Sequence, residues 1–226
     1  VKKKSKGLGA SAKFLGQILL GLGVAIYLYF FMDAGTRLDI PFFKNLSVML
    51  GLLYIPFVVV VIVGTSNAVN LTDGLDGLAI GCVISIALTY AGLSYVSGHA
   101  KLCQYLNIIY LPGVGELTVF CAAIVGAGIG FLWFNSYPAT VFMGDIGALA
   151  MGGAIGIVSV LIKKEILLLL VGGIFVLEAV SVILQVFWVK VFGKRLFLMA
   201  PFHHHLQMRG WAEPKIIIRF WIVAIV

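Results

Sequence analysis

Residues Ile166–Val189 read ILLLLVGGIFVLEAVSVILQVFWV, a nearly continuous run of apolar side chains. A helix needs roughly 20 such residues to cross about 30 Å of hydrocarbon. A lone strand at that depth would leave backbone N–H and C=O groups unpaired in lipid. The run therefore predicts a membrane-spanning helix.

Five further runs qualify or come close, and a seventh begins near Lys215 and is cut off by the end of the chain. The five are Phe14–Met32, Leu46–Val63, Leu78–Val96, Leu117–Phe134 and Ile146–Ile162. The composition agrees, because 62% of the residues are hydrophobic and only 11% are charged, against about 25% charged in a soluble domain. With no repeat or linker in view, we predict an all-α, polytopic membrane bundle that forms a single domain over residues 1–226.

The net charge of +7 does not indicate a nucleic-acid partner, since the basic residues form short clusters between apolar runs. If all seven runs cross, the amino-terminal segment and the loops 64–77, 135–145 and 190–215 share one face. The loops 33–45, 97–116 and 163–165 share the other face. Most of the lysines and arginines fall on the first face, so the positive-inside rule places it in the cytoplasm.

The loop between the second and third runs carries polar residues at every third position. They are Asn67, Asn70, Asp73 and Asp76, with Gly74 and Gly77 among them. On a helical or 3₁₀ turn this spacing stacks the side chains along one side. Carboxylate and amide oxygens suit Mg²⁺, and glycines let backbone N–H groups approach a phosphate. The alternative is a polar turn that only caps the helix beginning at Leu78.

Asp145 stands at the start of the fifth run, beside Gly144 and Gly147. As an N-cap it would satisfy free N–H groups and complement the helix dipole. Its carboxylate could instead hold a divalent metal that bridges a pyrophosphate. Phe142 is either an interfacial anchor or a stacking platform for a base, and spacing alone favours the anchor.

A third polar loop contains His203, His204 and His205. Three adjacent histidines cannot all point one way, so we do not expect a single tridentate metal site. They could donate hydrogen bonds to phosphate or titrate near neutrality, or belong to a merely solvated loop.

Two polar residues, Glu178 and Gln185, interrupt the run Ile166–Val189 two helical turns apart and so share a face. Polar residues inside a membrane usually face a bundle interior or a cavity. A transporter would place such groups near the bilayer midplane, whereas here the dense motifs are interfacial.

Taken together, these loops resemble the phospho-N-acetylmuramoyl-pentapeptide transferase family (the MraY translocases), in the polyprenyl-phosphate N-acetylhexosamine-1-phosphate transferase superfamily. The motifs that carry the resemblance are Lys6-Gly7-Leu8 with Lys13 and Gln17, Asn67 to Gly77, Phe142 to Asp145, and Pro201 to Leu206 followed by Gly210-Trp211 and Glu213-Pro214. The last motif is more similar to the muramoyl-pentapeptide branch than to the relatives that use UDP-N-acetylglucosamine, which stay as the alternative.

The resemblance implies a ten-helix fold, of which about seven helices are present here, and a homodimer in the bacterial cytoplasmic (inner) membrane. It implies Mg²⁺-dependent transfer of phospho-MurNAc-pentapeptide from UDP-MurNAc-pentapeptide to undecaprenyl phosphate, with lipid I and UMP as products. The reaction belongs to peptidoglycan synthesis, and its site would face the cytoplasm.

The resemblance also assigns roles to residues. Asp145 would bind Mg²⁺, and the residues with catalytic roles would be Asp73, Asp145, Lys13, His204 and His205. The substrate-binding residues would be Asn67, Asn70, Leu71, Gly74, Asp76, Asn135, Phe142, Gln185 and His203. The family carries an Asp-Asp pair just before a segment like 1–6, favoured as the base that activates the lipid phosphate. We therefore expect this sequence to be a fragment that lacks that pair, the first three helices and the end of the last helix, and to be inactive alone.

Overall fold

The computed structural model describes residues 9–32, 35–41, 43 and 46–226. Six helices in this part of the chain are long and apolar enough to cross a membrane. They are α1 (Ala10–Phe31), α2 (Tyr54–Thr72, preceded by the 3₁₀ turn η1, Gly51–Leu53), α3 (Leu78–Ser97), α5 (Leu117–Asn135, preceded by η2, Val114–Glu116), α6 (Gly144–Leu161) and α8 (Gly173–Phe192). The protein is an all-α, multi-pass membrane protein, as the sequence predicts.

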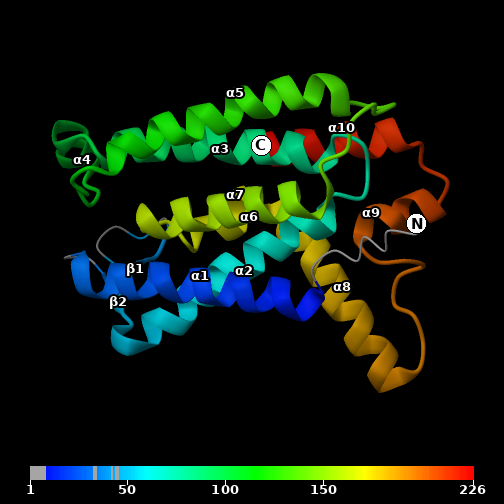
Figure 1. The fold of residues 1–226 in the computed structure, drawn as a ribbon, viewed down its shortest axis with the longest axis horizontal. Helices are drawn as coiled ribbons and strands as arrows, with labels where there is room; N and C mark the ends of the chain where they lie inside the picture. The colour runs from blue at the N-terminus through cyan, green and yellow to red at the C-terminus, as the bar shows by residue number, and fades with distance from the viewer. Residues whose placement is uncertain (1–8, 33–34, 42, 44–45) are drawn as a thin grey trace, which may run out of the picture.

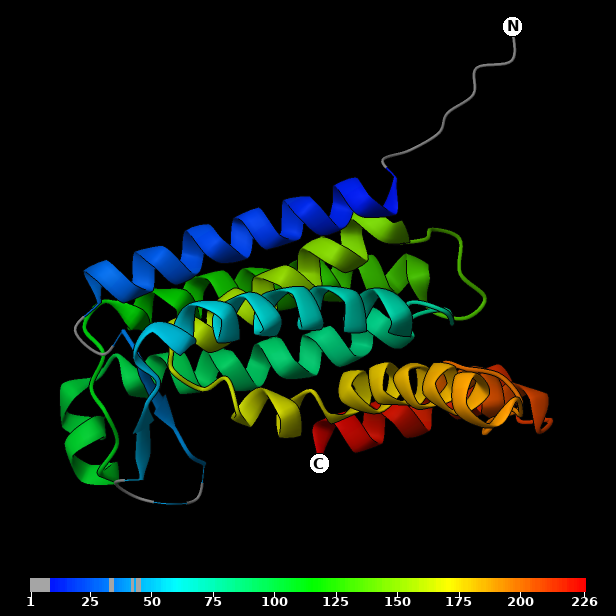
Figure 2. The same ribbon diagram turned by 90° about the horizontal axis from the view of Figure 1, so that it is seen from below.

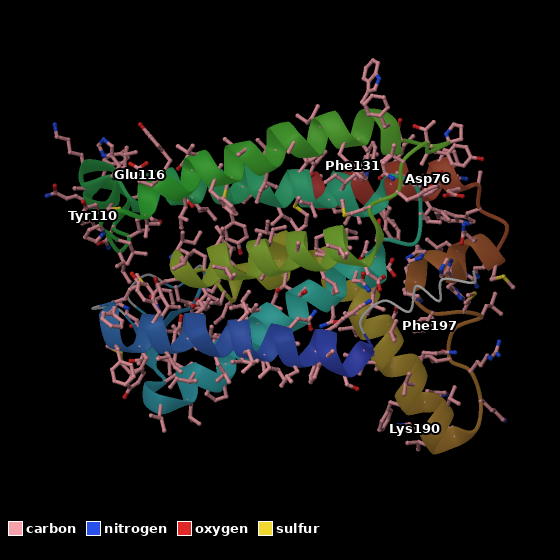
Figure 3. All side chains as sticks on the ribbon, in the orientation of Figure 1. Asp76, Tyr110, Glu116, Phe131, Lys190 and Phe197 are labelled. Atoms are coloured by element: carbon pink, nitrogen blue, oxygen red, sulfur yellow. The ribbon has the colours of Figure 1, made fainter. Side chains whose placement is uncertain are left out.

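The shorter elements are the strands β1 (Arg37–Asp39) and β2 (Ser47–Met49), and the helices α4 (Ala100–Leu106), α7 (Leu167–Val171), α9 (Phe202–Met208) and α10 (Glu213–Ile225). The bundle is elongated, and α10 packs along α3 so that the last described residues lie near its middle (Figure 1). The hairpin β1–β2 and α4 lie at one end, whereas α9 and the loop before α6 lie at the other (Figures 1 and 2). In Figure 3, Asp76 is at the α9 end, and Tyr110 and Glu116 are at the opposite end. The predicted grouping of loops on two faces is therefore confirmed for the described residues.

The predicted span Leu46–Val63 is wrong at both ends. Its first residues form β2, in which Val48 pairs with Leu38 of β1, and the helix α2 runs on through the polar residues to Thr72. Helical structure continues because these side chains find partners inside the bundle. The Asn67 amide, for example, donates to Val63 O at 2.8 Å and to the Gln17 side chain at 2.9 Å. The polar loop is thus reduced to residues 73–77.

The predicted span Ile166–Val189 is also wrong, because it breaks at Gly172. That residue has φ −92° and ψ 23°, outside the helical region, and it separates the five-residue α7 from α8. A Cβ at Gly172 would lie 2.7 Å from Leu168 O, so only glycine fits this close turn. After the break α8 leaves the direction of the other helices (Figure 1).

Glycines on α6 allow α2 and α6 to pack backbone to backbone. A Cβ at Gly152 would lie 2.6 Å from Thr65 O and 2.7 Å from Ser66 Cα, and one at Gly156 would lie 3.2 Å from Ile62 Cα. Small residues four apart are the usual way in which membrane helices approach closely. The Ser66 hydroxyl, which donates to Leu149 O at 2.9 Å, adds a polar contact at the same level.

A buried charged cluster lies at the hairpin end. The Lys163 ammonium group donates to Gly35 O at 2.8 Å and to the Tyr54 hydroxyl at 2.7 Å, and that hydroxyl donates to Glu165. Burial lowers the pKa of Lys163 to about 8, while Glu165 and Asp39 act in the opposite direction. Lys164 forms a further ion pair with Asp39 on β1 at 3.2 Å. The loop after α6 is thereby attached to the hairpin.

Replacing Gly152 with alanine is expected to lower the free energy of unfolding by about 1–3 kcal/mol, because the added methyl group meets α2 backbone that cannot move aside. Gly153→Ala is the matched control, since a Cβ at Gly153 meets no atom within 4 Å. That control is expected to be neutral or to stabilise α6 by up to about 1 kcal/mol. Thermal unfolding in detergent measures both, and equal Tm values for the two variants would contradict the packing described here.

Candidate functional site

The turn between α2 and α3 connects three distant parts of the chain. The Asp76 backbone N–H donates to Glu213 Oε1 at 3.3 Å, and the Gly77 N–H donates to Asn135 Oδ1 at 3.1 Å. The Asp76 carboxylate accepts from the Ala139 N–H at 2.9 Å. Gly77 itself has φ +76°, a left-handed conformation that favours glycine. The turn is therefore fixed against both the α5–α6 loop and the start of α10.

Capping does not explain the aspartates. The N-cap of α3 is Gly77 and that of α6 is Met143, and neither helix start has a side-chain cap hydrogen bond. Asp145 lies in the first turn of α6, where its charge suits the helix dipole. Its side chain is 59% exposed and forms an ion pair with Lys13 of α1. Helix capping by a side-chain hydrogen bond therefore does not account for Asp73 and Asp145.

Asp73 lies close enough to Asp145 for the two carboxylates to interact electrostatically. The pKa of Asp73 is raised, first by partial burial and second by the negative charge of Asp145. A cation between the two groups would relieve this repulsion. The convergence of these two loops, which the sequence predicts from topology alone, is present in the structure.

A polar cavity of about 200 Å³ opens beside this pair. Its lining comes from the turn after α2 and from the segment around the start of α6, and comprises Asp73, Gly74, Leu75, Asp76, Asn135, Phe142, Met143 and Gly144. Five residues singled out from the sequence therefore share one cavity. Phe142 is 73% exposed at its edge, where a ring can stack on a planar ligand.

An apolar groove of about 550 Å³ begins at Lys13 and Asp145 and follows α6 to Ile157. Other lining residues come from α1, α2 and α5, and include Leu20, Ile62, Leu149 and Phe120. Its polar groups are at the Asp145 end, where the Gln17 amide donates to the Ser66 hydroxyl at 3.0 Å. The groove therefore offers a long apolar surface with charges at one end.

The three histidines have different surroundings, as predicted for adjacent residues. His203 is fully buried against Glu178 of α8. The ring of His204 lies 2.7 Å from the Gln207 side chain, and His205 accepts a hydrogen bond from the Leu198 N–H at 3.1 Å. Only His204 and His205 are partly exposed.

Other predicted residues lie outside the cavity. Asn70 and Leu71 are half-buried on the last turn of α2, and Asn67 points to Gln17 of α1. The amide of Gln185 bonds to the backbone of Leu196 and Phe197, so it supports the loop before α9. The motif Lys6-Gly7-Leu8 falls outside the described residues. The sequence did not predict that Ser66 would bond to Leu149 O of α6 or that Glu213 would accept from the Asp76 N–H, although Glu213 belongs to the motif Glu213-Pro214.

Within the described ranges no three His, Cys, Asp or Glu side chains gather into a metal-binding cage. Asp73 and Asp145 nevertheless offer two carboxylates with hard oxygen donors. Mg²⁺ commonly takes one or two carboxylates and completes its shell with phosphate oxygens and water. The donor set fits an ion that binds together with a phosphate-containing substrate.

Curated proteins from several bacteria are similar to the whole chain. Proteins named phospho-N-acetylmuramoyl-pentapeptide-transferase are 59% identical in Citrifermentans bemidjiense, 58% in Geobacter sp. strain M21 and 55% in Desulfosudis oleivorans, each over 226 residues. These matches cover 100% of this chain and 63% of each relative's length. The sequence profile described as "Glycosyl transferase family 4" matches residues 5–163, which include Asp73, Asp145 and every lining residue of the polar cavity and of the apolar groove. The chain therefore belongs to glycosyl transferase family 4.

Proposed function

We propose that the protein containing this chain transfers phospho-MurNAc-pentapeptide from UDP-MurNAc-pentapeptide to undecaprenyl phosphate, giving lipid I and UMP. One observation carries the proposal. Gly144 lines the polar cavity and the next residue, Asp145, lines the apolar groove. A water-soluble donor and a lipid acceptor could therefore meet at one point, beside two carboxylates and a lysine. The names of the relatives agree with this reaction.

The polar cavity suits the nucleotide end of the donor. Its volume of about 200 Å³ is below the range of roughly 300–1,000 Å³ typical of whole-ligand sites. It would accommodate a base while the diphosphate extends toward Asp73 and Asp145. Asp76 and Asn135 already have backbone partners, so they shape the cavity, and Phe142 offers the stacking surface.

The apolar groove suits a polyprenyl chain, because burial of the chain's apolar surface is favourable and its phosphate would lie at the end that carries Lys13. In the proposed reaction an oxygen of the lipid phosphate attacks the sugar-bearing phosphorus of the donor. The bond from that phosphorus to the UMP oxygen breaks, and UMP leaves with the electron pair. Mg²⁺, when bound, would offset the diphosphate charge and ease the departure of UMP.

Among the chain's own residues, Asp145 would hold the ion with Asp73 beside it. Lys13 supplies a positive charge for phosphate, and His204 and His205 lie partly exposed on the same face. We infer direct attack without a covalent intermediate; isolation of a phosphosugar-labelled enzyme without acceptor would contradict it. We also infer that this face lies in the cytoplasm, where UDP-sugars are made.

A transporter is disfavoured, because Glu178 and Gln185 bind the backbone of His203 and Phe197, and neither residue lines the polar cavity or the apolar groove of the described part of the chain. A sister enzyme that uses UDP-N-acetylglucosamine is separated from the present proposal by a donor assay.

Asp145→Asn and Asp73→Asn in the full-length protein are each expected to lower kcat by about 10²-fold or more, because each removes charge from the reacting diphosphate site. Neither should change the Tm substantially, since both side chains are partly exposed. Asp39→Asn is the control, because that carboxylate pairs with Arg37 and Lys164 at the opposite end. UMP release measures turnover, and near-normal activity of either site variant removes that residue from the chemistry.

Purified full-length protein with undecaprenyl phosphate is expected to release UMP from UDP-MurNAc-pentapeptide and not from UDP-N-acetylglucosamine. Addition of EDTA should stop release and excess Mg²⁺ should restore it, since the donor set provides too few ligands to retain the ion without substrate. UMP release from UDP-N-acetylglucosamine alone would favour the sister activity. Full turnover in EDTA would show that the site works without a divalent ion.

A further inference from the structure

A buried acid and a buried histidine connect α8 to α9. Glu178 and His203 are both 0% exposed. The backbone N–H of His203 donates to Glu178 Oε1 at 3.1 Å, and the ring Nδ1 lies 3.1 Å from Oε2. An acid buried without partners would cost a large part of the folding free energy. The backbone hydrogen bond therefore fixes where α9 begins, and it places the His203 ring beside the Glu178 carboxylate.

The ring of His203 lies directly behind the wall of the polar cavity. A Cβ built on Gly74 would come within 2.4 Å of His203 Nε2 and 3.0 Å of Cε1, and Gly74 itself lines the cavity. Among the described residues neither ring nitrogen of His203 has a hydrogen-bond partner, and the ring has no contact with solvent. Unpaired buried nitrogens cost folding free energy. The ring fills the space directly behind Gly74, so it supports the turn by contact.

We propose that Glu178 and His203 are positioning residues that set the place of the Asp73–Gly77 turn and thereby the shape of the donor cavity. Glu178 fixes the backbone of His203 and lies against its ring, the ring supports Gly74, and the turn carries Asp73 and Asp76. His203 is not a catalytic residue, because complete burial keeps it from any substrate. The identity of the donor rests on the proposed function, whereas the contact itself does not.

The position of the turn predicts an effect on donor binding that is separate from acceptor binding. Residues 73–76 line the polar cavity, and none of them lines the apolar groove. A shifted turn should therefore impair donor binding and leave acceptor binding intact. A general loss of folding would impair both.

The test uses the full-length protein with Gly74→Ala, His203→Ala and the two combined. Gly74→Ala is expected to reduce kcat/KM for UDP-MurNAc-pentapeptide by about 10²-fold, the order of loss that a shift of about 1 Å produces, with an unchanged KM for undecaprenyl phosphate. In the double variant the methyl group occupies the space left by the ring, so kcat/KM should recover toward that of His203→Ala. Gly126→Ala is the control, since a Cβ there meets nothing within 4 Å. Equal effects on both KM values, or additive effects of the two substitutions, would overturn the proposal.

Thermal unfolding of the wild type, Gly74→Ala, His203→Ala and the double variant tests the contact without substrate. Residues in contact give non-additive changes in stability, so the effect of Gly74→Ala on Tm should vanish when His203 is alanine. If the wild type fails to release UMP while this coupling is present, the proposed function fails and the positioning pair stands.

If Gly74→Ala does not fold, Glu178→Ala and Glu178→Gln replace it. Glutamine keeps an acceptor for the His203 N–H, so the KM of Glu178→Gln for the donor should be closer to the wild-type value than that of Glu178→Ala. Equal donor KM values for these two variants would overturn the proposal.

Discussion

The contact of α2 with α6 at Ser66 and Gly152 determines where the two key carboxylates lie. The helices run in opposite directions, and Asp73 follows Ser66 by the same number of residues as Asp145 precedes Gly152. At 1.5 Å per residue both carboxylates therefore lie about 10 Å along the axis from the contact, at the same level. A bulkier residue at Gly152 would separate the helices and with them the two charges. The cavity, the groove and the Lys13 ion pair all depend on this register.

The membrane explains why the polar groups are concentrated at one end. Helices satisfy their own backbone groups in lipid, so free N–H groups and carboxylates collect where helices stop. The turn after α2 uses these free groups to bind Asn135, Ala139 and Glu213. An apolar groove along α6 can then reach the same place from within the bilayer. A substrate from water and one from lipid thus have separate approaches to a common boundary.

The sequence predicted the spans and the sharing of faces because hydrophobicity and alternation of sides are imposed by the bilayer itself. It predicted that the loops carrying Asp73 and Asp145 would lie on one face, whereas Asn135 and Phe142 were assigned to the site only through the family resemblance. It did not predict the end of α2 or the break at Gly172. Both depend on particular contacts, those of Asn67 with Gln17 and of Gly172 with the carbonyl group of Leu168. Nor could the short segment 163–165 be recognised as a buried cluster, because three consecutive charged residues look like an exposed turn.

The buried lysine at the hairpin end also constrains how the protein assembles. The helix α6 separates Asp145 at one end of the bundle from the charged segment 163–165 at the other. The partners of that segment, Tyr54 and Asp39, belong to earlier parts of the chain. A pair of charged groups that enters lipid before meeting its partners is costly. The hairpin and α2 precede α6 in the sequence, so insertion in the order of synthesis would make Tyr54 and Asp39 available before α6 is inserted.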